Sequence, residues 1–122
     1  MTARILAGLV GLIMLIQAFG WLLDPSSAAA SLGMIESLNA ETAIGKNTFI
    51  GDFTSFFFSV GLLSCIGAYT KQHEWLYGPV SLLAFAALFR IYAGLFHGTD
   101  FLISAIAAEI LMTFMLLVSI YL

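Results

Sequence analysis

Charged residues are scarce in this sequence, and their scarcity decides the class of protein. Only 9% of the 122 residues are charged, 61% are hydrophobic, and the mean hydropathy is +1.06. A soluble domain carries roughly 25% charged residues, so this chain cannot cover itself with a wetted surface. The formal net charge of −3 argues against a nucleic-acid partner, which needs a basic face. The composition therefore predicts an integral membrane protein with the lipid bilayer as its surroundings.

Cysteine and histidine are also rare, which excludes several kinds of site. The single cysteine, Cys65, can form neither an internal disulfide nor a CxxC redox pair, which argues against thiol–quinone oxidoreductases with embedded cysteine pairs. Of the two histidines, only His97 lies near the charged residues of the apolar runs. One histidine with nearby carboxylates is a poor ligand set, so we expect no metal site. No Gly-rich phosphate loop or HExxH motif occurs, and the sequence leaves any cofactor unknown.

Four apolar runs are long enough to cross a bilayer, which takes roughly 20 helical residues. The runs show no strand alternation, and two of the three connectors are so short that the helices they join must be antiparallel neighbours. We therefore predict an all-α integral membrane fold, an antiparallel four-helix transmembrane bundle in a single domain, 1–122. The apolar core of the first run is too long for a signal peptide, so we expect it to be retained. The predicted spans are about 5–23, 49–69, 75–96 and 101–122.

The connector between the first two spans is long enough to hold structure of its own. Asp24 suits a helix N-cap, Pro25 the first helical position and Gly33 the stop, which predicts a short interfacial helix. Residues 34–45 have a rough apolar face. This pattern favours a segment that lies on the lipid headgroups over the alternative, a lid on the outer end of the bundle.

The few charges outside the spans indicate an orientation. Arg4 and Lys71 lie on one side of the predicted bundle together with Glu74, whereas most of the acids lie on the other side with Lys46. The positive-inside rule then places both termini in the cytoplasm.

Polar residues in all four spans fall at similar depth in the outer leaflet. At about 1.5 Å per residue, Gln17 and Arg90 lie about 9 Å from the outer span ends, Glu109 about 12 Å and Asp52 about 5 Å. Arginine keeps its proton even in a membrane, so it needs a carboxylate, and its forked guanidinium suits a bidentate one. We predict that Arg90 pairs with Glu109, with Asp52 as the second choice.

Helical spacing adds further polar residues to this predicted outer-leaflet chamber. Serines three and seven positions after Asp52 make a polar stripe on the second span. His97 follows Arg90 at i+7, and Gly94 between them opens space. The residues predicted to bind a ligand in or near the mouth of the chamber are Gln17, Ser55, Ser59, His97 and Asp100.

The chamber suggests one leading function and two alternatives. We interpret the chain as a small membrane protein that binds a lipophilic molecule with a polar head, such as a quinone, isoprenoid or sterol-like ligand. If it is an enzyme, Asp52 or Glu109 would be the acid or base, and Arg90 would stabilise developing negative charge. The first alternative is a noncatalytic accessory subunit of a larger membrane complex, in which the ion pair only fixes the helices. The second is a proton-coupled small-molecule carrier that works as a homo-oligomer.

Four stretches of the sequence together form a pattern that resembles a known family. They are "GWLLDPSSAAASLG" after the first span, "GDFTSFFFSVG" at the start of the second, "FRIYAGLFHG" at the end of the third and "AIAAEI" in the fourth. The chain resembles, over most of its length, the DoxX-like group of small bacterial four-helix membrane proteins. The resemblance implies a four-helix bundle in the bacterial inner membrane. Named DoxX-type proteins are linked to quinone-coupled sulfur oxidation, and other relatives are accessory membrane proteins.

Overall fold

The computed structural model describes residues 1–32 and 47–122, and every regular element in these two ranges is helical. Four of the helical stretches are long and apolar enough to cross a membrane. This confirms the predicted all-α four-helix transmembrane fold and makes the chain a small integral membrane protein. The four long helices are α1 (Thr2–Leu23), α4 (Thr54–Thr70), α5 (Glu74–Phe96) and α6 (Ile103–Tyr121).

Two short elements lie at the end of the bundle opposite the termini. The helix α2 (Pro25–Ser31) follows α1 directly, and the π-helix η2 (Phe49–Phe53) leads into α4. The Asp24 carboxylate accepts hydrogen bonds from the backbone N–H and the hydroxyl of Ser27, at 3.3 and 2.8 Å. The predicted cap and first residue of α2 are thus confirmed, whereas Gly33 and segment 34–45 lie outside the described residues.

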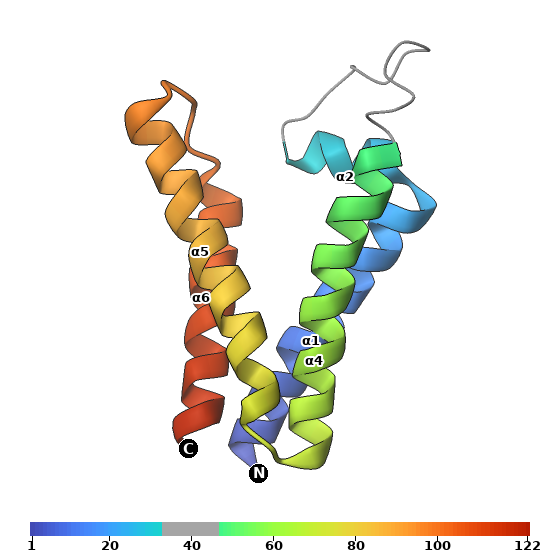
Figure 1. Cartoon of the computed structure of the whole chain (residues 1–122), viewed down its shortest axis with the longest axis vertical. Helices are drawn as coiled ribbons and strands as arrows, with labels where there is room; N and C mark the ends of the chain where they lie inside the picture. Colours follow the sequence, from blue (N-terminus) through green and yellow to red (C-terminus); the bar gives the residue numbers. More distant parts are fainter. Residues whose placement is uncertain (33–46) are drawn as a thin grey trace.

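The long helices alternate in direction and form two pairs (Figure 1). α1 packs against α4, and α5 packs against α6. Further contacts of α1 with α6 and of α4 with α5 close the four helices into a ring. Both termini lie at one end, which we call the terminal end. The two pairs lie close together there and diverge toward the opposite end, which we call the α2 end (Figure 1).

Small residues bring α1 and α4 into backbone contact. A Cβ atom added to Gly61 would lie 2.9 Å from the carbonyl oxygen of Gly11 and 2.9 Å from the backbone nitrogen of Leu15. Such approach is typical of membrane helices, which associate through packing because lipid is as apolar as their side chains. Helical spacing of small residues in the sequence predicts the Gly11 face of this contact.

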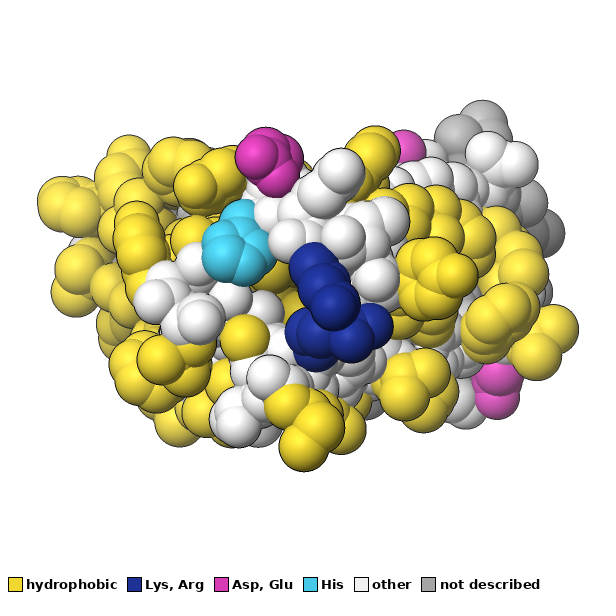
Figure 2. All heavy atoms as spheres, turned by 90° about the horizontal axis from the view of Figure 1, so that it is seen from below, with side chains coloured by type: hydrophobic (Ala, Val, Ile, Leu, Met, Phe, Trp, Pro, Cys, Tyr) yellow, Lys and Arg dark blue, Asp and Glu magenta, His cyan; other side chains and the backbone are white. Residues whose placement is uncertain are grey.

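The core fills the terminal half of the bundle, where the four helices are closest. Ser119 Oγ donates a hydrogen bond to the Ala3 carbonyl oxygen at 2.7 Å, which joins α6 to α1 near both termini. Seen from the terminal end, large apolar side chains surround a small group of basic ones (Figure 2). One contiguous cluster of buried apolar residues consists of Ala7, Val10, Met14, Val60, Leu76, Leu83, Met112, Leu116 and Ile120.

Candidate functional site

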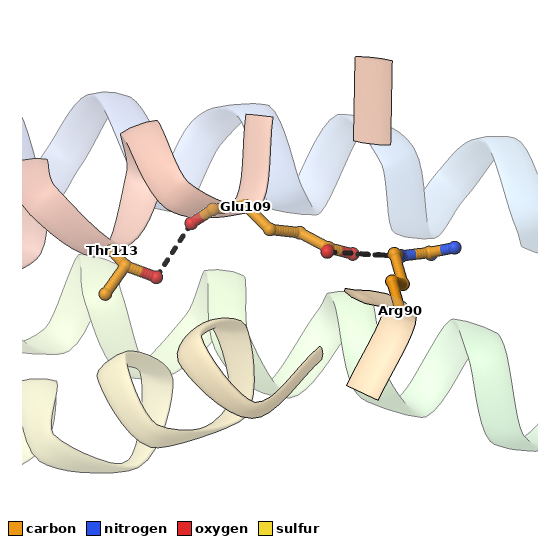
Figure 3. A network of polar contacts seen from close by, with 3 residues as sticks. All are labelled: Arg90, Glu109 and Thr113. Atoms are coloured by element: carbon orange, nitrogen blue, oxygen red, sulfur yellow. Dashed lines mark hydrogen bonds and ion pairs between the residues drawn. The ribbon is translucent and has the colours of Figure 1, made fainter. Parts of the chain in front are cut away.

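An ion pair joins α5 to α6 in the half of the bundle nearer the α2 end. Arg90 Nε lies 2.9 Å from Oε1 and 3.1 Å from Oε2 of Glu109 (Figure 3). Arg90 precedes the end of α5 at Phe96 by six residues, and Glu109 follows the start of α6 at Ile103 by six, so both lie about 9 Å from their helix ends. The pairing predicted from depth is therefore present.

The geometry of this ion pair differs from the expected two-pronged one. Only Nε contacts the carboxylate, which it bridges, while the terminal nitrogens of Arg90 point away from Glu109 (Figure 3). Among the residues that the structure describes, these terminal nitrogens have no hydrogen-bond acceptor. A guanidinium carries five N–H groups, so the other four have no acceptor within residues 1–32 and 47–122.

A cavity of about 410 Å³ lies beside the ion pair. Its floor includes Met14, Leu83 and Met112, which also belong to the core of the terminal half. The cavity therefore begins where the packed core ends and the helix pairs diverge. The other described residues that line it are Gln17, Gly20, Trp21, Ala28, Ser31, Leu32, Phe56, Phe57, Arg90, Ser104, Ala105, Ala108 and Glu109.

A second cavity of about 290 Å³ meets the first at the ion pair. Arg90 and Glu109 line both cavities, and the second cavity adds Asp52 from η2. Asp52 is exposed and lies beyond ion-pair distance of Arg90. The described part of the chain thus brings four predicted polar residues around these spaces: Gln17, Asp52, Arg90 and Glu109.

Aromatic rings form a wall shared by the two cavities. The Trp21 ring stacks on Phe53 with centroids 4.7 Å apart, and it lies 6.2 Å from the ring of Phe57. Trp21 is only 3% exposed and lines the first cavity. The sequence carries one signal that Trp21 belongs to the site: it follows Gln17 at i+4 and therefore shares its helix face.

The serine stripe of the second span does not enter the site. Ser55 and Ser59 are exposed and line neither cavity, whereas Asp52 lines the second. The reason is η2, since a π-helix closes its hydrogen bonds from i to i+5 and turns less per residue than the α-helix that the spacing assumes.

The residues predicted at the mouth also lie elsewhere. His97 and Asp100 are exposed beyond the end of α5 and line neither cavity; the His97 ring lies 5.5 Å from that of Tyr92. The space beside Gly94 is filled by the Phe101 ring, which a Cβ at Gly94 would strike. This glycine therefore serves helix packing and opens no space for a ligand.

Thr113 follows Glu109 at i+4 but acts on the backbone. Its hydroxyl donates to the Glu109 carbonyl oxygen at 2.7 Å, as drawn in Figure 3. Its side chain borders a separate apolar groove of about 320 Å³ between α5 and α6. The other residues of this α5–α6 groove are Ala84, Ala87, Ile110, Phe114 and Leu117.

Comparison of the chain with protein-family models, with curated proteins and with solved structures finds no match. The fold and the site themselves define the class, a small all-α integral membrane protein with a charged pair beside a largely apolar cavity.

Proposed function

We propose that this protein binds a lipophilic molecule with a polar head, such as a quinone, isoprenoid or sterol-like ligand, in the cavity beside Arg90 and Glu109. One observation carries the proposal: a guanidinium with unpartnered N–H groups borders an otherwise largely apolar cavity of about 410 Å³. Small-molecule sites have this form, with volumes of roughly 300–1,000 Å³, apolar walls and a few convergent polar groups.

If the bound molecule reacts, the proposal assigns the chemistry to three side chains. Both carboxylate oxygens of Glu109 already accept from Arg90 Nε, so Glu109 mainly positions the guanidinium. Asp52 faces the second cavity and forms no ion pair with a described residue, which makes it the available acid or base. The terminal nitrogens of Arg90 would stabilise negative charge that develops on the ligand.

The accessory-subunit function is the second candidate, and the α5–α6 groove favours it. This groove is apolar, holds about 320 Å³ and shares no lining residue with the cavity beside Arg90, so it suits a helix of a larger complex. A proton-coupled carrier has less support, because the polar side chains buried in the terminal half of the described bundle are two serines, Ser64 and Ser119, and neither is ionisable.

We also propose that the protein belongs to the DoxX-like group and lies in a bacterial inner membrane with both termini in the cytoplasm. The sequence resemblance supports the first part. Arg4 and Lys71 support the orientation, because both are exposed, one in the first turn of α1 and the other directly after α4. Figure 2 shows basic side chains on the terminal end, as the positive-inside rule expects of a cytoplasmic face.

Ligand binding can be tested with a substitution that places a large side chain in the cavity. Ala108 lines the cavity, and Ala108→Phe would occupy the space next to Glu109. We expect the purified native protein to retain a lipophilic compound, measured by organic extraction and mass spectrometry, and the variant to retain at most about one tenth as much. That loss corresponds to about 1.4 kcal/mol of binding free energy.

The matched control is Ala84→Phe, which makes the same change in the α5–α6 groove. It should leave the retained compound unchanged if the cavity is the binding site. Loss of the compound in Ala84→Phe but not in Ala108→Phe would contradict the proposal and point to the groove instead.

A further inference from the structure

We infer that the head group recognised at Arg90 is an uncharged hydrogen-bond acceptor, such as a ketone or ester oxygen, and not an anion or a cation. This inference rests on the proposed binding function of the same cavity and specifies the chemical class of its ligand. Three features carry it: the unpartnered donors, the charge balance and the apolar wall.

The donors require an acceptor. Arg90 Nε is already occupied by both oxygens of Glu109, whereas the terminal nitrogens point away from the carboxylate (Figure 3). The Arg90 side chain is 31% exposed, so its terminal N–H groups can reach a ligand in the cavity. A hydrogen bond to a charged group contributes about 1.5–3 kcal/mol, which a ligand oxygen placed there supplies and lipid tails do not. A head without an acceptor oxygen gains nothing at this position.

The charge balance disfavours an anionic head. Arg90 is the only basic side chain among the described residues that line either cavity, and it is neutralised by Glu109. Asp52 adds a second carboxyl group in the adjoining cavity. A phosphate or carboxylate head would therefore enter a space that already has one acid more than it has bases, and like charges repel.

A cationic head fails for a different reason. It has donors and no acceptor, so it cannot satisfy the terminal N–H groups of Arg90, and it carries the same charge as the guanidinium. The carboxylate nearest to it is already shared with Arg90 Nε at 2.9 and 3.1 Å. The extra acid, Asp52, lines only the second cavity, so a cation that pairs with Asp52 still leaves the terminal N–H groups of Arg90 without an acceptor. An uncharged oxygen meets the donors without either penalty, while its apolar body contacts the Trp21 wall and the Met14 floor.

Trp21 provides a direct readout for the experiment. The chain has two tryptophans, and the other, Trp75, lies at the start of α5 near the terminal end. Trp75→Phe leaves Trp21 as the only reporter in the cavity wall, and Trp21→Phe leaves Trp75 as the control for partition into the detergent micelle. The probes are brominated stearic acid methyl ester, brominated stearate and brominated stearylamine, which share one tail and quench tryptophan on contact.

The titration is made at a pH at which the acid is ionised and the amine is protonated. We expect the ester to quench Trp21 at about tenfold lower mole fraction than either charged probe, the ratio set by one hydrogen bond to a charged group. Trp75 should respond equally to all three. The double replacement Arg90→Met with Glu109→Met keeps the charge balanced and should abolish the preference for the ester while circular dichroism stays that of a folded helical protein.

The possible outcomes distinguish a failure of the head-group inference from a failure of the proposed ligand-binding function. If stearate or stearylamine quenches Trp21 as well as the ester does, and better than it quenches Trp75, the site binds lipid but the inferred head group is wrong. If the ester preference survives in the double variant, Arg90 does not read the head and the inference fails. If no probe quenches Trp21 more than Trp75, the proposed function fails and this inference with it.

Discussion

At the scale of single residues, one guanidinium organises the site. An arginine in the middle of a membrane costs about 2.5–3.5 kcal/mol on insertion scales and cannot give up its proton. Glu109 offsets this cost through one nitrogen, and its own side chain is only 10% exposed against 31% for Arg90. The pair is thus a buried carboxylate held by a partly accessible cation, which leaves the cation free to contact something else.

This arrangement predicts strong coupling between the two side chains. We expect Arg90→Met or Glu109→Met alone to lower the free energy of unfolding by about 2–3 kcal/mol, because each leaves one charge without its partner. The double replacement should cost about 1 kcal/mol or less, since it removes both charges together. Unfolding in detergent, followed by circular dichroism, measures the coupling.

Lys71→Met and Glu74→Gln are the controls, because both residues are exposed at the terminal end. Each should change the free energy of unfolding by less than about 0.5 kcal/mol, as exposed substitutions usually do. Additive losses for Arg90 and Glu109 would show that the ion pair contributes little to stability.

At the scale of elements, the sequence predicts the features that depend only on a constant helical rise and misses those that depend on local winding. The similar depth of Arg90 and Glu109 depends on the helical rise alone, and the structure shows these two residues paired. The faces of Asp52 and Ser55 are not predictable, because η2 changes the rotation between them. The burial of Trp21 is likewise not predictable from its own helix, because it depends on Phe53 and Phe57, which belong to other elements.

The α1–α4 contact predicts a position-specific effect of adding one methyl group. Gly61→Ala should lower the free energy of unfolding by about 1–3 kcal/mol, because its Cβ would lie 2.9 Å from the Gly11 carbonyl oxygen and the helices must move apart. Gly20→Ala has nothing within 4 Å of its added Cβ and should raise stability by up to about 1 kcal/mol through helix propensity.

Chemical unfolding of the two variants in the same detergent tests this contrast. Equal effects at Gly61 and Gly20 would mean that α1 and α4 do not meet through glycine.

At the scale of the whole molecule, four crossings return the chain to the side on which it starts, and both termini lie at the terminal end (Figure 1). The proposed cytoplasmic location of this end predicts the behaviour of fusion reporters. Green fluorescent protein fused after Leu122 should fluoresce, whereas alkaline phosphatase fused after Gly98, in the turn at the α2 end, should be active.

Replacing both Arg4 and Lys71 with Glu should lower the fluorescence and raise the share of inverted chains, because cytoplasmic basic residues set the orientation. Active phosphatase after Leu122 in the native sequence would reverse the assignment.

Two close contacts lie inside the helix pairs: Gly11 with Gly61 between α1 and α4, and Arg90 with Glu109 between α5 and α6. The contacts that join one pair to the other lie chiefly near the termini, as in the Ser119 bond to Ala3. Because the ion pair and the glycine contact each lie within one pair, a change in the distance between the two pairs at the α2 end would require neither of them to break.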